Sequence, residues 1–587
     1  EPKIHTMVTL DPCEDIEGLD SDTLKVVNNE IELLEEWKKI IIEYDPDIIT
    51  GYNIWGFDFK YMYDRYKYLI SKELEDSTGT KAEFEEELDK SINNFWKFSR
   101  LENDNCRFQL KDLSSSALGD NRLYYFETKG RVQIDLLKLA QKDYNLDSYK
   151  LDNVSSIFLQ GTVENLTGNT FTSNSVDGLF VGNQVSFIDI DGDKIENGKK
   201  YTIQNISENN ITIDENIKDI YKKAKIDKLE KKKNEMPDKE NFDESKIKYK
   251  LTWCENKIDL PPNKIFENFH ISQKKVYNEK LKREYKQLND SEAGRKMKEI
   301  AVYCIKDCVL CNTLMIKLDV ITKNIGMANV CCVPLSYLFL RGQGVKIFSV
   351  ISKTTKKENY IIPLITKDDI NDVSYEGAIV FPPKEGGLLS RNPVAVMDYS
   401  SLYPSCMISD NISHDSLIAV YDTDLDGNNP VELRVKDKLY NKYNRNSDKY
   451  PYEKLQESIK TGEINKIEYD NIENGENIGK RQCYFEWNNG QKKGILPKVL
   501  NELLQARKRT RKQQKQYDSS NFMWGVLEGL QLAYKITCNS VYGQMGASTS
   551  ALCIKELAAS TTAKGRVVLI VGKDLVINRE LYPKDYL

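Results

Sequence analysis

The sequence predicts a multi-domain α/β protein, and three observations support this class. The chain has 587 residues, well beyond the roughly 250–300 residues at which a single hydrophobic core stops growing. Its early part alternates helical and strand patterns (30–140), which are followed by short alternating runs typical of an all-β unit (161–219). Two long helical patterns lie near the end (497–543). We therefore expect several domains of different construction.

Composition limits the classes of function. Charged residues make up 30% and hydrophobic residues 40%, and no apolar run approaches the roughly 18 residues of a transmembrane helix, so we expect no membrane contact. The net charge of −6 argues against an overall basic nucleic-acid binder but allows a local cationic groove. Three scattered histidines leave the chemistry to carboxylates and cations.

The twelve cysteines are scattered and mostly lie in apolar stretches. This usage predicts a reducing intracellular compartment. Cys308 and Cys311 have the spacing of zinc ligands, but no second pair lies nearby. We favour buried helix cysteines over a zinc site.

The first α/β segment begins with a predicted helix over 30–44. After Pro46 a strand over 47–50 ends at Gly51 and delivers Tyr52-Asn-Ile-Trp-Gly-Phe-Asp58 to a sheet edge. Residues 59–100 have a charged, mostly helical pattern. Gly130-Arg-Val-Gln-Ile-Asp135 predicts another strand, with a helix following from Leu136.

The sequence pattern changes in the middle of the chain. Residues 161–219 predict a small all-β insertion, with a barrel as one possibility, because Val, Ile and Thr alternate between Gly, Asn and Asp turns. For the highly charged stretch 222–248 we favour a solvated helix or linker over a nucleic-acid tether. A helical period returns over 296–325.

The last third contains two predicted constructions. Segment 365–420 alternates strands and turns, and the polar stretch 425–480 suggests a surface elaboration. Residues 497–517 and 521–543 predict an αα-hairpin joined at Asp518-Ser-Ser520.

Two short stretches of this part carry chemistry. Asp398-Tyr-Ser-Ser-Leu-Tyr-Pro-Ser405 follows the apolar run 394–397, which predicts a buried strand whose end stiffens the Asp398 carboxylate against a metal ion. In Lys535-Ile-Thr-Cys-Asn-Ser-Val-Tyr-Gly543, the side chains of Lys535, Asn539 and Tyr542 share one helix face. The alternative for the first stretch is an aspartate that caps a helix, beside a Tyr-Pro that ends a strand.

The helical hairpin supplies cations. Arg507 and Arg511 lie one turn apart on the first helix and face Lys535 and Asn539 on the second. Guanidinium groups bind phosphate bidentately and lysine adds a point charge, so the four predict a clamp for a triphosphate. The alternative is a solvated basic face.

These motifs together resemble those of the family B DNA polymerases, most closely the delta-type replicative enzymes of eukaryotes and large DNA viruses. The resemblance rests on five ordered stretches: Tyr375–Val380, Asp398–Ser405, Gly494–Pro497, Ala506–Lys508 and Lys535–Gly543. It implies a DNA-dependent DNA polymerase that uses two Mg²⁺ ions, deoxynucleoside triphosphates and primer-template DNA, with a sliding clamp or accessory factors as possible partners. The nucleus and a cytoplasmic viral factory are the implied locations.

The resemblance also implies roles for single residues. Asp398 and the Tyr399 carbonyl hold metal, and Tyr403 excludes a 2′-hydroxyl. The implied nucleotide-binding residues are Tyr399, Ser400, Ser401, Leu402, Tyr403, Arg507, Arg511, Lys535 and Asn539, and the implied DNA contacts are Asn53, Tyr542, Gly543 and Arg566.

A second site is implied in the first part of the chain. Asn53–Asp58 and Tyr303–Asp307 resemble the second and third motifs of the family's 3′→5′ exonuclease. Asp58 and Asp307 then hold metal, and Tyr303 orients the attacking water. Asp15-Ile-Glu17 has the letters of the first exonuclease motif, but we interpret it as a decoy in an acidic loop without an apolar strand before it.

The implied domains follow these motifs. They are an RNase H-like exonuclease domain (1–160 and 281–345) with an insertion (161–280), a partial palm (346–490), helical-hairpin fingers (491–545) and the start of a second palm segment (546–587). Tyr421-Asp-Thr-Asp424 resembles the palm's second carboxylate motif only superficially, and its turn-rich neighbours suggest a surface loop.

The chain is expected to be a piece of a longer protein, since it starts at Glu1 and lacks one carboxylate motif for each site. We expect neither site to be complete in this chain and therefore no certain activity for it alone. The alternatives are a degenerate, non-catalytic polymerase-like scaffold and a stand-alone exonuclease, which would leave the fingers helices without a purpose.

Overall fold

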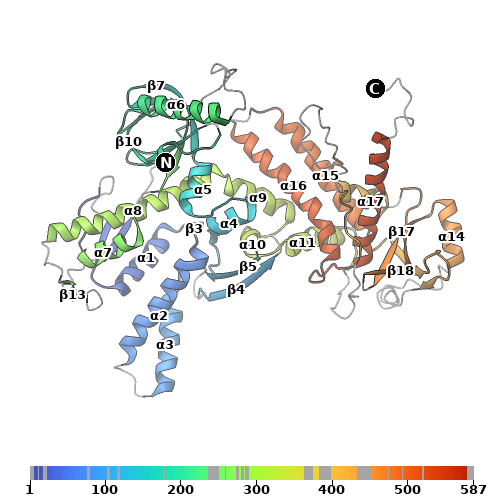
Figure 1. Ribbon diagram of the computed structural model, residues 1–587. Coiled ribbons are helices and arrows are strands. Elements are labelled where there is room, and N and C mark those ends of the chain that lie inside the picture. Colours follow the sequence, from blue (N-terminus) through green and yellow to red (C-terminus); the bar gives the residue numbers. More distant parts are fainter. Residues whose placement is uncertain are drawn as a thin grey trace. The chain divides into compact units, whose positions relative to one another are not determined.

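The computed structural model divides the chain into two compact units, Glu1–Val320 and Ile321–Leu587, whose elements are labelled in Figure 1. The structure describes residues 6–10, 12–16, 23–75, 80–101, 106–115, 119–176, 179–189, 191–235, 250–257, 260–272, 277–278, 283–284, 290–362, 375–381, 398–432, 452–473, 475–491, 493–518 and 521–577. The strand predicted over 394–397 lies outside them, as do Glu17 and the later part of the charged stretch, 236–249.

The first unit contains the predicted α/β segment. Its elements before the insertion are β1 (Met7–Leu10), β2 (Leu24–Val27), α1 (Glu30–Tyr44), β3 (Ile48–Gly51), a π-helical turn (Ile54–Asp58), α2 (Phe59–Glu75), α3 (Lys81–Phe95), β4 (Phe108–Ser115), β5 (Gly119–Phe126), β6 (Val132–Asp135), α4 (Leu136–Asp143) and α5 (Leu151–Phe158). β3 and β6 pair in parallel, from Ile48 opposite Val132 to Gly51 opposite Asp135. The predicted helix over 30–44 and both predicted strands are confirmed.

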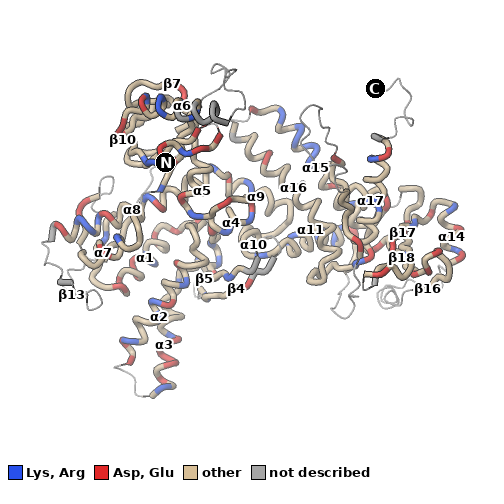
Figure 2. The backbone as a smooth tube through the Cα atoms, viewed as in Figure 1, with Lys and Arg blue, Asp and Glu red and all other residues tan. Residues whose placement is uncertain are grey.

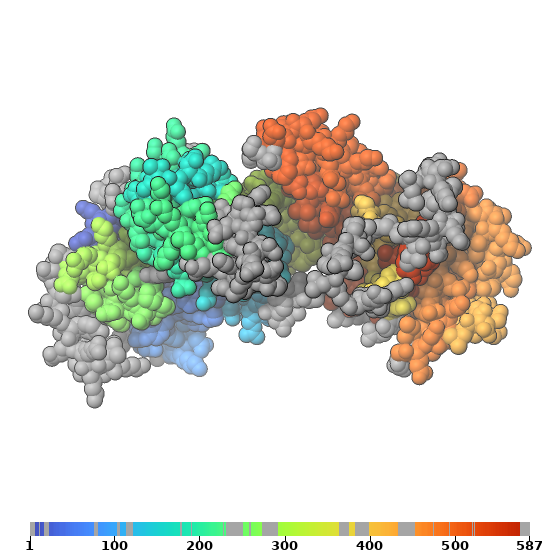
Figure 3. All heavy atoms as spheres, turned by 45° about the horizontal axis from the view of Figure 1, so that its top comes forward, coloured from blue at the N-terminus to red at the C-terminus, as the bar shows by residue number. Residues whose placement is uncertain are grey.

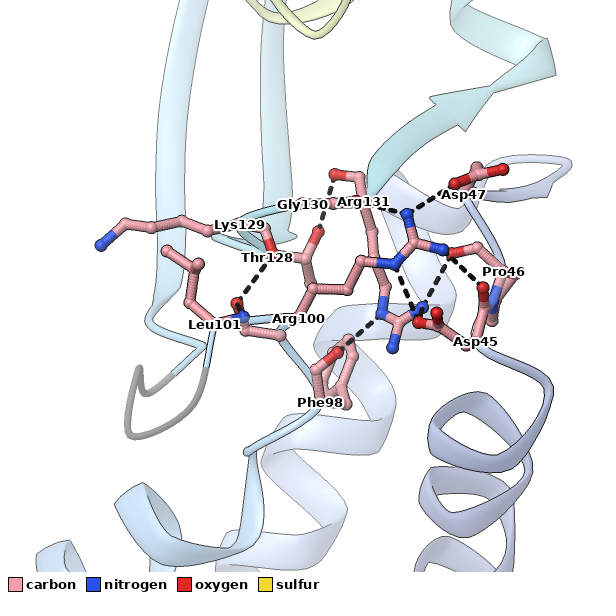
Figure 4. Close-up of polar contacts among 11 residues, drawn as sticks. Asp45, Pro46, Asp47, Phe98, Arg100, Leu101, Thr128, Lys129, Gly130 and Arg131 are labelled. Atoms are coloured by element: carbon pink, nitrogen blue, oxygen red, sulfur yellow. Dashed lines mark hydrogen bonds and ion pairs between the residues drawn. The ribbon is translucent and has the colours of Figure 1, made fainter.

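Two arginines fix the entrance to this parallel pair (Figure 4). Arg100 donates to Asp45 and Asp47 at 2.8 and 2.5 Å, and the buried Arg131 reaches Asp45 at 2.7 Å and donates to the Phe98 carbonyl at 2.9 Å. The loops that lead into β3 and β6 are thereby joined. Because parallel strands end on one sheet edge, residues that follow β3 lie beside residues that follow β6.

The predicted all-β insertion is confirmed as a closed barrel, which Figure 3 shows as a compact body in teal and green. Its strands are β7 (Gln160–Thr167), β8 (Thr170–Ser173), β9 (Gln184–Ile188), β10 (Tyr201–Ser207), β11 (Asn210–Ile213) and β12 (Thr252–Asn256). β12 lies beyond the predicted 161–219 and closes the barrel between β7 and β9. No local sequence signal shows that a single strand so far along the chain belongs to the barrel.

The charged stretch after β11 begins as a helix, α6 (Ile217–Glu235). Lys228 attaches it to the barrel through Asp189 and Asp191 at 2.8 and 2.7 Å. The predicted helix is thus confirmed up to Glu235, but its barrel-facing side is not solvated, since Ala224 and Lys228 are buried. The unit ends with α7 (Pro262–Ser272), the short strands β13 (Tyr277–Asn278) and β14 (Arg283–Glu284), and the long helix α8 (Asp290–Lys317), which packs on β3, α5 and α7.

The second unit is built around the predicted αα-hairpin. Its elements are α9 (Val320–Cys331), α10 (Tyr337–Leu340), α11 (Gln343–Lys357), α12 (Leu402–Ser409), β15 (Leu417–Thr423), β16 (Val431–Glu432), α14 (Tyr452–Thr461), β17 (Ile464–Glu473), β18 (Glu476–Glu486), α15 (Ile495–Gln514), α16 (Phe522–Gly546) and α17 (Lys555–Ile577). α15 and α16 form the hairpin, and α12 packs against α15, α16 and α17. A single buried core joins these helices to the sheet.

The prediction of strands and turns over 365–420 is wrong for its described helical part. Leu402–Ser409 forms α12, and the Ser405 N–H closes the first turn on the Ser401 carbonyl at 2.9 Å. Pro404 does not end a strand, because a proline in the first helical turn loses no intrahelical hydrogen bond.

The surface elaboration predicted over 425–480 is also wrong for its described residues from Tyr452 onward. The strands form a four-stranded antiparallel sheet in the order β16-β15-β18-β17. Its polar sequence conceals buried positions such as Ile467, Tyr469, Cys483 and Phe485, which belong to the core. Composition misled here because buried polar residues on β18, Arg481 and Gln482, interrupt the apolar pattern, although a second core around Leu455 and Tyr484 also covers the sheet.

The same sheet revises the loop predicted around Tyr421–Asp424. Tyr421, Asp422 and Thr423 lie in β15, and Arg481 on β18 donates two hydrogen bonds to Asp422 at 2.7 and 2.8 Å. Asp424 starts the following turn, where it accepts from the Asn428 N–H at 2.7 Å. The two aspartates of this stretch, Asp422 and Asp424, therefore have structural roles.

Candidate functional site

A pocket of about 400 Å³ in the second unit gathers the predicted nucleotide-binding residues. It is lined by Asp398, Tyr399, Ser400, Ser401, Leu402, Tyr403, Pro404, Arg507, Lys535 and Asn539. The first four belong to the turn that leads into α12, the next three are the first residues of α12, and the last three belong to the hairpin helices α15 and α16. Three motifs, spread over more than a hundred residues of sequence, therefore share one cavity.

The turn before α12 has an unusual backbone. Ser401, the residue before the helix, has φ 54° and ψ 53°, in the left-handed region that few residues other than glycine adopt. This conformation reverses the chain between Asp398 and Leu402, and both line the pocket. Strained positions of this kind are concentrated at functional sites.

Aromatic contacts hold Tyr403 in place. Its ring lies 4.5 Å from the ring of Tyr542, centroid to centroid. On its other side a Cβ atom at Gly565 would come within 2.9 Å of the Tyr403 ring, so only glycine fits there without displacement. Tyr403 therefore forms a fixed wall of the pocket.

Tyr399 is anchored against α17 in a similar way. Its hydroxyl donates to the Val568 carbonyl at 3.2 Å, and a Cβ atom at Gly572 would lie 2.3 Å from that hydroxyl oxygen. The side chain thus packs on α17, while the residue itself lines the pocket. The carbonyl role predicted for Tyr399 stays a prediction.

Figure 2 shows lysines and arginines along α15, and the pocket uses one of them. Arg507 is oriented by Gln531 on α16, whose Oε1 accepts from its Nε at 3.2 Å. Lys535 and Asn539 are exposed on α16. Arg511 is exposed one turn beyond Arg507 and is not among the lining residues, so three of the four predicted clamp residues meet in the pocket.

The predicted DNA contacts are more dispersed. Tyr542 packs on Tyr403, and Gly543 is exposed beside it. Arg566 donates to the carbonyls of Glu376 and Gly377, both at 2.9 Å, and so fixes the segment at Tyr375–Ala378. Its position favours a structural role over the predicted DNA contact.

A second site lies in the first unit, at the edge where β3 and β6 end. Asn53 follows β3 with φ 65°, and its side chain lies over Gly56, where a Cβ atom would come within 2.2 Å of Asn53 Oδ1. The chain then makes the π-helical turn that ends at Asp58. Such turns recur at functional sites.

Asp135, which the sequence did not single out, holds this turn. Its carboxylate accepts from the N–H groups of Asn53 at 2.9 Å, Trp55 at 3.0 Å and Leu137 at 2.9 Å. Burial raises the pKa of Asp135, and these N–H groups act in the opposite direction. The sequence could have identified Asp135 through the parallel pairing of the two predicted strands, because that pairing places Asp135 opposite Gly51, just before Asn53.

The other predicted exonuclease residues lie on α8. Tyr303 and Asp307 are one turn apart there, and Lys257, which directly follows β12, donates to Asp307 Oδ2 at 2.5 Å. The Lys257 ammonium also lies 4.5 Å from the centre of the Tyr303 ring. Sequence reasoning missed Lys257 because the inserted barrel separates it from every motif.

Asp58 and Asp307 act on a common neighbour. Desolvation by the surrounding protein raises the pKa of the Cys308 thiol, although the residue as a whole is exposed, and both carboxylates raise it further. Burial also raises the pKa of each carboxyl, although Lys257 and Tyr303 act against this at Asp307. Both predicted metal ligands therefore lie near enough to Cys308 to act on its charge.

The donor chemistry of both sites fits a hard divalent cation. Among the described residues Asp307 Oδ1 is buried without a hydrogen-bond partner, and Asp398 opens onto the pocket. Carboxylate oxygens are the ligands that Mg²⁺ prefers. No group of three or more His, Cys, Asp or Glu side chains converges as a metal site in the part of the chain that is described, which includes Cys308 and Cys311.

Three further expectations concern the cysteines, a membrane-crossing helix and the decoy motif at Asp15. Cys311 is buried, but Cys304 and Cys308 are exposed on α8, so the prediction of buried helix cysteines is only partly correct. No described helix is both long and apolar enough to cross a membrane. Asp15 lies five residues after Leu10, the last residue of β1, so the reason given for the decoy, that no strand precedes it, is wrong.

Comparisons with known proteins match both parts of the chain to one family. The family model for DNA polymerase family B matches residues 333–585, and that for the family B exonuclease domain matches residues 1–154. The DNA polymerase of Pyramimonas orientalis virus is 37% identical across 97% of this chain and 42% of its own length. The DNA polymerase delta catalytic subunit of Drosophila melanogaster is 26% identical across 98% of this chain and 36% of its own length.

One solved structure extends the comparison. The family B DNA polymerase from the hyperthermophilic archaeon Pyrobaculum calidifontis aligns with 94% of this chain and 46% of that chain, at 16% identity and a TM-score of 0.45. The chain thus spans less than half the length of each of these relatives.

Proposed function

The chain belongs to the family B DNA polymerases, and from this premise we propose that it carries the exonuclease and nucleotide-binding parts of a DNA-directed DNA polymerase with 3′→5′ proofreading. One observation supports the proposal most: one pocket is lined by Asp398, Arg507, Lys535 and Asn539, which come from three separate motifs. The substrates are deoxynucleoside triphosphates and primer-template DNA. Extension of a primer by the full-length protein tests the proposal.

The pocket residues divide the work of binding a nucleotide. Arg507 and Lys535 neutralise triphosphate charge, and Gln531 fixes the orientation of the arginine. The backbone N–H groups of the reversed turn at Ser401 add donors for phosphate oxygens. Tyr403 forms the wall next to the sugar.

Metal ions complete this chemistry when bound. Asp398 in the pocket, and Asp58 with Asp307 in the first unit, are the residues that would hold Mg²⁺, which activates an oxygen nucleophile and stabilises charge on the reacting phosphate. The first unit then hydrolyses the terminal phosphodiester of a primer. Tyr303 holds the attacking water, and the Lys257 ammonium offers hydrogen bonds to a phosphate oxygen.

Replacing Tyr403 with alanine is expected to reduce discrimination against ribonucleotides by at least about tenfold. The ring is fixed by Tyr542 and by the close approach of Gly565, so it cannot move aside for a 2′-hydroxyl. The measurement is the ratio of kcat/KM for a deoxynucleotide and its ribonucleotide. Tyr403→Phe keeps the wall and should keep the ratio, and equal ratios in the alanine and wild-type proteins would remove Tyr403 from this role.

Replacing Lys257 with methionine is expected to slow excision roughly 10²-fold and to move the acidic limb of its pH profile to higher pH. Lys257 lowers the pKa of Asp307 against the opposing effect of burial. Without the ammonium, Asp307 takes up a proton at a higher pH, and the active ionised carboxylate is lost earlier as pH falls. Tyr303 and Asp58, the other groups that face this region, are unchanged in the comparison.

The pH profile should be measured as kcat/KM on a single-stranded oligonucleotide. Lys199→Met removes a lysine that pairs with Glu215 within the barrel and serves as the control with an unmoved limb. An acidic limb at the wild-type position in Lys257→Met would show that Lys257 does not act on the catalytic carboxylate.

A further inference from the structure

The barrel insertion and the exonuclease site share one segment of chain. β7 starts one residue after the Leu159 that follows α5, and β12 ends at Asn256, directly before Lys257. The barrel is thus inserted between α5 and a residue that contacts Asp307. Any shift of β12 in the barrel moves Lys257 relative to α8.

A first set of contacts fixes the backbone of Lys257. Its N–H donates to Asp152 Oδ1 at 2.9 Å, which lies in the first turn of α5. Its carbonyl accepts from Lys200 Nζ at 2.8 Å, and the same ammonium lies 3.3 Å from Asp152 Oδ1. Lys200 directly precedes β10, so a residue of the barrel holds both Lys257 and Asp152, which accepts the hydrogen bond from the Lys257 N–H.

A second set reaches the residue next to Asp307. Asn183, which is 4% exposed, donates from Nδ2 to Glu255, which is 1% exposed on β12. The Oδ1 of Asn183 accepts from Lys306 Nζ on α8 at 2.8 Å. This buried chain therefore connects β12 to the helical turn that carries Asp307.

The first set of contacts leads from the barrel to Lys257, and the second leads from the barrel to the helical turn that carries Asp307. We therefore propose that the barrel is a positioning module of the proofreading site. It holds the ammonium of Lys257 and the carboxylate of Asp307 in register for hydrolysis. Lys200 and Asn183 are its positioning residues, and they act through Lys257 and Lys306. The inference rests on the exonuclease function proposed above and assigns a role to the insertion.

The geometry makes the expected loss one of rate. A misplacement of about 1 Å at a reacting group costs roughly 10²-fold in rate. The barrel contacts named here do not involve Asn53, an implied DNA contact, or the Tyr303 backbone, so we expect substrate binding to change little. Lys200→Met keeps the aliphatic stem and removes the ammonium that holds the Lys257 carbonyl. Asn183→Ala removes the link between Glu255 and Lys306.

The test is excision of a single-stranded oligonucleotide by the full-length protein. Lys200→Met and Asn183→Ala should each lower kcat roughly 10- to 100-fold, with KM changed less than threefold. Lys200→Arg should restore most of the rate. Lys199→Met, at the neighbouring position, removes a charge that pairs within the barrel and should leave the rate unchanged.

A double-mutant cycle separates positioning from general damage to the fold. In a Lys257→Met background, Lys200→Met should cost no further rate, because the group that it positions has gone. Independent multiplication of the two losses would overturn the proposal, and so would wild-type kcat in both Lys200→Met and Asn183→Ala. Absence of excision in the wild-type protein would instead refute the proposed exonuclease function.

Discussion

Asp398→Ala is expected to lower nucleotide addition by roughly 10³-fold or more, about 4 kcal/mol of transition-state stabilisation, while excision continues. Asp398 is exposed at the pocket, on the turn that Ser401 reverses. Its removal therefore takes away a metal ligand and leaves the core intact. The measurement is single-nucleotide extension of a matched primer.

The control for this variant is Asp424→Ala. Asp424 belongs to the stretch whose letters resemble the second carboxylate motif, but it accepts hydrogen bonds from Asn428 and Asn429 in a turn. Extension by Asp424→Ala should stay within about twofold of the wild type. If Asp398→Ala extends a primer at the wild-type rate, the metal assignment fails.

Asp58→Ala is expected to abolish proofreading, with a decrease of roughly 10³-fold in the excision of a mismatched terminus. Asp58 lies at the end of the π-helical turn that Asp135 holds through Asn53 and Trp55. The substitution leaves the Lys257–Asp307 pair in place. Its effect should therefore be the loss of one ligand.

Asp64→Ala provides the matched control for Asp58→Ala. Asp64 lies on α2, the helix that directly follows Asp58, where it is exposed and paired with Lys60, so a surface substitution there should cost little. Continued excision of a mismatched terminus by Asp58→Ala, at the rate of Asp64→Ala, would exclude Asp58 from the site.

The sequence predicted those parts of the fold in which local pattern and tertiary structure agree. The helix over 30–44 has its capping residue Asn29, whose side chain accepts from the Glu32 N–H, and the hairpin α15–α16 has its cap Asn521. Alternation also revealed the barrel. Each of these signals is contained within a few neighbouring residues.

The failures come from interactions between distant segments. β12 joins the barrel from beyond a long charged helix, and Arg481 converts an acidic stretch into a strand by pairing with Asp422. Lys257 reaches Asp307 only because the barrel closes. No spacing rule connects such residues, so a single sequence could not reveal them.

The candidate site was predicted more completely than the fold around it. Asp398, Arg507, Lys535 and Asn539 meet in one pocket as the motifs implied. Motif residues carry chemistry that restricts their identity, whereas the polar sequence of β17 and β18 mixes its core positions with buried polar residues such as Gln482. Arg566 shows the limit, because its place on Glu376 and Gly377 follows from packing that the motif does not specify.

The most direct test of the account is one reaction in which addition and excision are both followed on a primer with a labelled terminus. The full-length protein is compared with its Asp398→Ala and Asp58→Ala variants. The account predicts reciprocal losses: Asp398→Ala excises but does not extend, and Asp58→Ala extends but does not excise. Loss of both activities in either variant, or of neither, would contradict two separate sites built on these residues.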